Sequence, residues 1–251
     1  MKIALAQYRP GETVDGNLKL ALEAGAKAAS AGAELICYNQ FFLGLIPPTY
    51  DARLIETLSQ ASKKNQLAAV TGNLVINSDS CEASSAYFDK NGNLAAFEPE
   101  KSAVCKMEPP TELFETALGP MLVLEELEAY DGAIDASIQE VKPRIIVMQV
   151  SAISLLELEA IKELAIDRSY NQAPLVLTVS MVGEFAGQNY LGCSMAVMQG
   201  QILGEAAAAE DDLLIVNVDP THFIDYRALK EPVTIPELLQ QKLVHESSFE
   251  S

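Results

Sequence analysis

The sequence has few of the residues from which metal sites and disulfide frameworks are built. Its 251 residues include two histidines and four cysteines, and the cysteines lie far apart with no Cys-x-x-Cys spacing: Cys37, Cys81, Cys105 and Cys193. A zinc ribbon, a disulfide framework or a histidine-rich metal site is therefore not expected. We expect reduced thiols, no metal and no cofactor.

Basic residues are also scarce. The chain has 17 lysines and arginines against 35 aspartates and glutamates, which gives a formal net charge of −18. Such a charge repels phosphate groups, so it argues against nucleic acid or an anionic membrane as a partner. An acidic excess of this kind is typical of a solubilising surface.

Long apolar runs are absent too. The sequence contains no stretch of about 18 uninterrupted apolar residues, the length that a transmembrane helix needs. The opening MKIALAQY becomes polar too soon for a secretory signal peptide. We therefore expect a soluble, cytoplasmic protein that does not insert into a membrane.

What the chain does have is enough apolar sequence for a full core. Hydrophobic residues make up 49% of it, and α/β sandwiches of this length commonly form one domain. We expect a single domain over residues 1–230. The remainder, residues 231–251, is expected to form a C-terminal arm that packs on the domain or on a partner subunit, because it carries one amphipathic piece, IPELLQQKLV.

Strand-like runs alternate with segments of helical periodicity. Helices are expected at residues 17–31, at 52–65, and from a capping box formed by Ser154 and Glu157 to about Gln172. Strand-like runs include residues 2–8, 32–39, 67–76, 121–127 and 144–151. Asn91-Gly92 predicts a tight hairpin turn with positive φ angles. Strands, helices and hairpins in this arrangement favour a layered α/β domain over a purely parallel, doubly wound sheet.

Six segments, in this order, carry a more specific signal: KIALAQYRP, GAELICYNQFFLG, SSAYFDKNGNL, AIDRSYNQAPLVLTVSMVG, YLGCSMAVMQGQILGEA and LIVNVD. Together they resemble the nitrilase, or carbon-nitrogen hydrolase, superfamily over about residues 1–230. The resemblance implies a four-layer α-β-β-α sandwich. It also implies a homodimer or a higher homo-oligomer.

The family's reaction uses a cysteine nucleophile, a glutamate base and a lysine that stabilises the developing charge. Its Pro-Glu dipeptide at the end of the second strand falls on Asn39-Gln40, so the base has become Gln40. A carboxamide has nearly the shape of a carboxyl group and still forms hydrogen bonds, but it cannot accept a proton at neutral pH. The resemblance thus implies a site that keeps this geometry without its base.

The other two positions are also altered or ambiguous. The family's cysteine falls on Glu126, or on Glu125 if the register shifts by one residue, and none of the four cysteines lies on this strand. The family's lysine falls near Lys101, with Lys106 as the alternative. Glu125 and Glu126 are adjacent in a predicted strand, so they are expected to face opposite sides, with one of them solvated.

These positions predict a family member that has lost thiol-dependent amide or nitrile hydrolysis and acts as a non-catalytic ligand-binding or assembly protein. The altered site could hold a salt bridge from Glu126 to Lys101 or Lys106, or a small amine or amide ligand between Glu126 and Gln40. An active amidase-type hydrolase of non-peptide C–N bonds is the alternative, using a non-standard catalytic set that includes Glu126 or a relocated cysteine.

The other candidate residues favour structural roles. Cys37 lies inside a predicted buried strand and is expected in the core, whereas Cys105 and Cys193 are the thiols that could reach a pocket. His222 is expected at the surface or at an interface, at the start of a helix, rather than as a catalyst. Arg168, in the long helix, is expected to form a plain exposed ion pair, of the kind worth about 0–1 kcal/mol, with a pairing to a carboxylate near the dimer face as the alternative.

Overall fold

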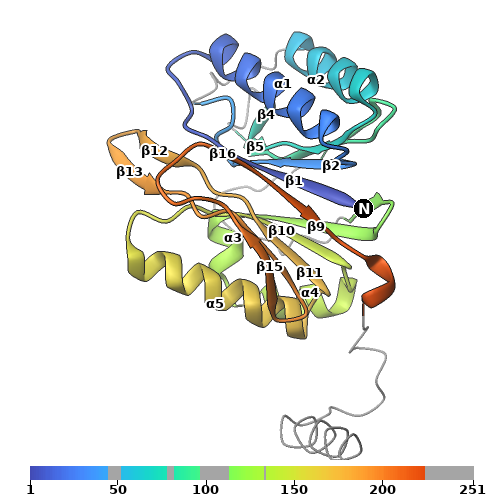
Figure 1. Cartoon of the computed structure of the whole chain (residues 1–251), viewed down its shortest axis with the longest axis vertical. Helices are drawn as coiled ribbons and strands as arrows, with labels where there is room; N and C mark the ends of the chain where they lie inside the picture. Colours follow the sequence, from blue (N-terminus) through green and yellow to red (C-terminus); the bar gives the residue numbers. More distant parts are fainter. Residues whose placement is uncertain (45–51, 78–81, 97–112, 133, 224–251) are drawn as a thin grey trace, which may run out of the picture.

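Two six-stranded sheets face each other, and each carries helices on its outer side, in a computed structural model of the chain (Figure 1). The structure describes residues 1–44, 52–77, 82–96, 113–132 and 134–223. Within these residues the layers run helix, sheet, sheet, helix, so the predicted α-β-β-α sandwich is confirmed. The predicted arm, residues 231–251, lies outside the described residues, and the boundary at residue 230 stays a prediction.

The first sheet is mixed. Its strands, in spatial order, are β16 (Asp212–Asn217), β1 (Lys2–Gln7), β2 (Leu35–Tyr38), β3 (Ala68–Val70), β6 (Ala86–Phe88) and β7 (Leu94–Ala96). β1, β2 and β3 are parallel, while β16 and β6 pair antiparallel at either side of them.

The second sheet repeats this plan. Its strands, in spatial order, are β15 (Gln201–Glu205), β14 (Met195–Met198), β11 (Leu175–Thr178), β10 (Ile145–Gln149), β9 (Gly119–Glu125) and β8 (Phe114–Thr116). β10 lies between β9 and β11 and is parallel to both, so its predicted central position is confirmed.

Helices cover the outer faces of both sheets. On the first sheet lie α1 (Val14–Ser30) and α2 (Ala52–Asn65), and on the second lie α3 (Glu126–Tyr130), α4 (Ile134–Val141) and α5 (Leu155–Asn171). Two further antiparallel pairs are β4 (Leu74–Asn77) with β5 (Glu82–Ser84) and β12 (Val182–Phe185) with β13 (Gln188–Leu191). None of the helices that the structure describes has the length and apolar character needed to cross a membrane.

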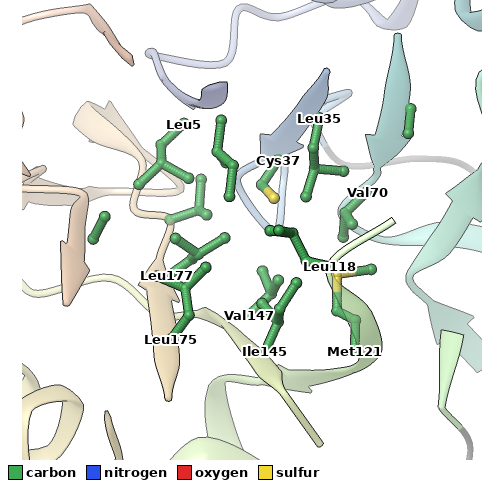
Figure 2. Close-up of a cluster of buried hydrophobic side chains, with 14 of the residues drawn as sticks. Leu5, Leu35, Cys37, Val70, Leu118, Met121, Ile145, Val147, Leu175 and Leu177 are labelled. Atoms are coloured by element: carbon green, nitrogen blue, oxygen red, sulfur yellow. The ribbon is translucent and has the colours of Figure 1, made fainter. Parts of the chain in front are cut away.

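Apolar side chains fill the three spaces between the four layers. Leu5, Val70, Val147 and Leu177 belong to the cluster between the two sheets, part of which Figure 2 shows. Neighbouring residues on the same strands point outward into two further clusters, one under α1 and α2 and one under α3, α4 and α5. Each central strand is therefore buried on both faces, which is why these strands read as continuous apolar runs rather than alternating ones.

The structure corrects several expected elements. Residues 67–76 form two strands, β3 and β4, separated by Thr71, Gly72 and Asn73. In the β6–β7 hairpin Gly92 has a positive φ of 82° but Asn91 does not, because the Asp89 carboxylate accepts from the backbone N–H groups of Asn91 and Asn93 and organises a longer turn. The short strands β8, β12 and β13 were not predicted.

Candidate functional site

The parallel strands of the two sheets bring their carboxyl ends together. Gln40 lies just beyond β2, Asn73 lies in the break between β3 and β4, and Ser85 precedes β6 in the first sheet. Glu125 ends β9 and Gln149 ends β10 in the second sheet, and these two residues are register partners. We refer to Gln40, Asn73, Ser85, Glu125 and Gln149 as the strand-end cluster.

A close backbone crossing fixes Gln40. The Asn73 N–H donates to the Gln40 carbonyl at 2.7 Å. A Cβ atom on Gly72 would overlap the carbonyl oxygens of Asn39 and Gln40, so only glycine lets the chain after β3 pass so close to the loop after β2. The break that divides residues 67–76 into two strands therefore serves to hold this loop.

Glu125 occupies the middle of the cluster. Its Oε1 accepts from the Ser85 N–H at 3.0 Å, and the Gln40 side chain also hydrogen-bonds to this carboxyl group. With its amide oriented to satisfy both groups, Asn73 donates through Nδ2 to Oε2 at 3.0 Å and to Oε1 at 3.1 Å. Burial raises the pKa of Glu125 to about 7, and the negative charge of Glu128 on α3 acts in the same direction, against the lowering by the hydrogen bonds.

Gln149 ties the two sheets together beneath Glu125. Its Nε2 donates to the Thr71 carbonyl at 2.7 Å and to the Tyr38 carbonyl at 3.0 Å, both in the first sheet. Its Oε1 lies 2.7 Å from Ser85 Oγ. The side chain of Gln149 is fully buried, so every polar atom of its amide needs these partners.

Glu126 lies outside this cluster. β9 ends at Glu125, and Glu126 is the first residue of α3, so the expectation that both glutamates share a strand is wrong. Glu126 is half-buried, and its pKa is raised by burial and by the charge of Glu157. Both glutamates are partly shielded from solvent, so the expectation that one of them is solvated is not met.

Lys101 and Lys106, the candidates for the family's lysine, lie outside the described residues, as do Cys81 and Cys105. Among the residues that the structure does describe, no group of three or more histidines, cysteines, aspartates and glutamates is arranged to hold a metal ion.

Neither of the two described thiols belongs to the strand-end cluster. Cys37 points into the apolar layer between the sheets, as predicted for a core residue, and burial raises its pKa well above the ordinary value (Figure 2). Cys193 is 5% exposed, and burial together with the charge of Glu205 raises its pKa against the lowering effect of Lys162. A raised pKa leaves little thiolate at neutral pH, so neither cysteine is activated as a nucleophile.

Arg168 does not form the exposed ion pair expected of it. Its side chain is 1% exposed, and its Nη2 lies 3.2 Å from Asp135 Oδ1. Helical periodicity alone did not show that this position of α5 faces the second sheet, where Nη1 also reaches Met148 Sδ at 3.8 Å.

His222 ends a short 3₁₀ turn, Pro220–His222, rather than starting a helix.

The described residues also line a small cavity that includes no residue of the strand-end cluster. It lies between the first sheet and the helices α1 and α2, has a volume of about 20 Å³, and is lined mainly by apolar side chains such as Leu22, Ile36 and Leu58. A space of this size holds about one water molecule, so it is not a ligand site.

Three members of the cluster were missed from the sequence. The sequence does distinguish Gln149, because it is the one polar residue of the apolar run IIVMQ and ends that run. No sequence feature distinguishes Asn73 or Ser85, since each reaches the site only through a strand break or a loop that the sequence pattern did not reveal.

Comparison with known proteins agrees with this architecture. The sequence model of the family described as carbon-nitrogen hydrolase matches residues 2–154. None of the curated proteins compared with the chain matches it.

Solved structures of an amidase from Nesterenkonia sp. AN1 have the same fold. A glutamate-to-glutamine variant, showing Michael addition of acrylamide at the active-site cysteine, superposes with a TM-score of 0.74 and 21% identity over 91% of this chain and 97% of that chain. The NitN amidase after tag removal superposes with a TM-score of 0.74 and 20% identity, over 96% of this chain and 99% of that chain. A cysteine-to-serine variant, described as an amidase from the nitrilase superfamily, superposes with a TM-score of 0.72 and 20% identity, over 96% of this chain and 97% of that chain.

Proposed function

Because the chain belongs to the carbon-nitrogen hydrolase family, we propose that it keeps the family's sandwich but has lost thiol-dependent hydrolysis of amides and nitriles. It acts instead as a non-catalytic ligand-binding or assembly protein of the cytoplasm. Fold alone does not fix activity, so this proposal rests on the site.

The observation that carries the proposal is the contact between Glu125 and Gln40. The resemblance put the family's nucleophile at Glu126 or Glu125, and the geometry favours Glu125, because it is the glutamate that hydrogen-bonds to Gln40. At this point of the fold a carboxyl group then replaces the sulfur, and a carboxamide replaces the base. Neither replacement performs its part in the thiol mechanism.

The bonding of Glu125 also argues against its use as a substitute nucleophile. Donors from Ser85 and Asn73 surround both of its oxygens. With a pKa raised to about 7 by burial, a large fraction of the group is neutral at physiological pH. A neutral carboxyl group is a poor nucleophile.

One observation favours a second candidate, an active hydrolase with a non-standard catalytic set. A buried carboxyl group with a pKa near 7 is suited to general acid–base chemistry. In this alternative Glu125, rather than Glu126, is the acid–base group, and a thiol outside the described residues is the nucleophile.

A small neutral amide, or an amine, is the ligand class that fits a site of this composition. Gln40 and Asn73 offer amide groups and Glu125 offers a carboxyl group, which together supply both donors and acceptors.

We also propose a homodimer or higher homo-oligomer. The apolar side chains of Tyr130, Ile153, Leu155 and Leu156 are exposed on the α3 and α5 side, and they support this proposal.

Ammonia release from a panel of small amides and nitriles tests the loss of activity. The wild-type protein is expected to release none above the background set by a Glu125→Ala variant. The double variant Gln40→Glu, Glu125→Cys restores the family's residue types at both positions and is the positive comparison. Turnover by the wild type that disappears in Glu125→Ala would establish the active alternative instead.

A further inference from the structure

The Ser85 hydroxyl has fewer protons than its two close oxygen contacts in the strand-end cluster require. Gln149 has two N–H bonds on Nε2, and both are used by the carbonyl groups of Tyr38 and Thr71. The amide orientation is therefore fixed, because the opposite one would face an oxygen toward two carbonyl oxygens. Gln149 Oε1 consequently points at Ser85, and it can only accept.

Ser85 has a single hydroxyl proton but two close oxygen neighbours. Its Oγ lies 2.7 Å from Gln149 Oε1 and 3.0 Å from Glu125 Oε1. Since the amide oxygen carries no proton, the serine hydroxyl donates to Gln149. The 3.0 Å contact with Glu125 then lacks a proton unless the carboxyl group supplies it.

We infer that Glu125 is a neutral carboxylic acid in the folded protein below neutral pH and that it donates its proton to Ser85. The result is a series of hydrogen bonds in which Glu125 donates to Ser85, Ser85 donates to Gln149, and Gln149 donates to the carbonyl groups of Tyr38 and Thr71. These bonds cross between the two sheets, because Glu125 and Gln149 belong to the second sheet and their partners belong to the first. This series makes the joint between the carboxyl ends of the two sheets sensitive to the protonation of one residue.

The surroundings of Glu125 agree with a neutral group. Among the described residues, the charged group that acts on it is Glu128 of α3, whose carboxylate accepts from the Glu125 N–H at 3.0 Å and disfavours a second negative charge. The neighbours Gln40 and Ser85 are uncharged, and their hydrogen bonds lower the pKa, but less than burial raises it. Burial raises the pKa of Glu125 from 4.5 to about 7, in the same direction.

Ionisation of Glu125 would disturb the joint in a defined way. If Ser85 turned its proton toward the carboxylate, the buried Oε1 of Gln149 would lose its donor. If Ser85 kept its bond to Gln149, a carboxylate oxygen would face a serine lone pair at 3.0 Å. Either arrangement is less favourable than the neutral chain, because buried polar groups without partners are costly.

The direction of the pH effect follows from linkage. A carboxyl group whose pKa is higher in the folded than in the unfolded protein contributes stability that is fully present below the unfolded value. That stability is lost as the pH rises through the folded value, here about 7. Replacing Glu125 by glutamine mimics the neutral acid and removes the effect.

Infrared difference spectroscopy of protein with ¹³C-labelled glutamate carboxyl groups tests the inference directly. The wild type is expected to show the carbonyl band of a protonated carboxyl group at about pH 6 and to lose it by about pH 8.5. The band should be absent in Glu125→Gln, should persist in Glu128→Gln, and should shift in Ser85→Ala, because the proton loses its acceptor. A wild-type spectrum without this band at about pH 6, or a band unaffected by Ser85→Ala, would overturn the inference.

Urea unfolding over the same pH range gives an independent readout. The midpoint for the wild type should fall relative to Glu125→Gln as the pH rises from about 5 to about 8. Parallel curves for wild type and Glu125→Gln would contradict the inference. If Glu125→Gln does not fold, the spectra of the wild type and Ser85→Ala still decide it.

Discussion

Single residues without reactive groups determine how the site is built. Gly72 lets two backbone segments touch, and this contact sets where Gln40 lies relative to Glu125. The family resemblance drew attention to the positions of the base and the nucleophile. The geometry adds the glycine that holds one of them and the serine whose hydroxyl contacts both Glu125 and Gln149.

Replacing Gly72 by alanine should destabilise the protein by about 1–3 kcal/mol, the usual range for forcing extra atoms into a packed region. The new Cβ would overlap the carbonyl oxygens of Asn39 and Gln40, which are backbone atoms and cannot turn away. Urea unfolding measures the change. Gly132→Ala is the matched control, because an added Cβ there meets nothing within 4 Å. Equal stability of the two variants would show that the backbone crossing is not as close as described.

At the scale of the element, strand ends position the chemistry. β9 and β10 are in register, so Glu125 and Gln149 emerge side by side. The carbonyl groups that accept from Gln149 belong to Tyr38, at the end of β2, and Thr71, just beyond β3. The joint between the sheets therefore includes one buried amide that bonds two strands of the facing sheet.

Replacing Gln149 by leucine should cost about 2–4 kcal/mol, because two buried carbonyl groups would lose their donors. Thermal or urea unfolding measures the loss. Gln201→Ala, at an exposed position of strand β15, should change stability by less than about 0.5 kcal/mol. A Gln149→Leu variant as stable as the wild type would mean that the amide does not bridge the sheets.

Helices and long strands were easier to predict than the site. Residues 52–65 were expected as a helix and form α2, because apolar residues recur there at helical spacing. The register at Glu125 and Glu126 could not be fixed, since two adjacent glutamates fit the pattern equally well and only the end of β9 separates them. Asn73 and Ser85 depend on tertiary contacts across a strand break, and no local pattern encodes such contacts.

At the scale of the molecule, two surface properties stand out. The net charge of −18 makes the surface strongly acidic as a whole. Against this background Leu155 and Leu156, at the start of α5, are 74% and 82% exposed, with Tyr130 and Ile153 also exposed. Leucines this exposed on an acidic protein are where a homodimer or higher homo-oligomer would be expected to form.

A glutamate in place of Leu156 should convert the expected dimer into monomer, because it places a charge in an apolar contact. Light scattering coupled to size-exclusion chromatography measures the mass. Leu20→Glu is the control, since Leu20 is 42% exposed on α1, on the opposite outer face. A wild-type protein that is already monomeric, or a dimer that survives Leu156→Glu, would exclude this surface as the interface.

The central claim is that a carboxyl group, not a thiol, faces Gln40 between the strand ends. A crystal structure in which sulfur atoms are located by anomalous scattering tests it most directly. The structure should show the oxygens of Glu125 bonded to Ser85 and Asn73, with no sulfur in contact with Gln40. A thiol from any of the four cysteines, Cys81 and Cys105 included, in contact with both a lysine ammonium and the Glu125 carboxylate would contradict the claim.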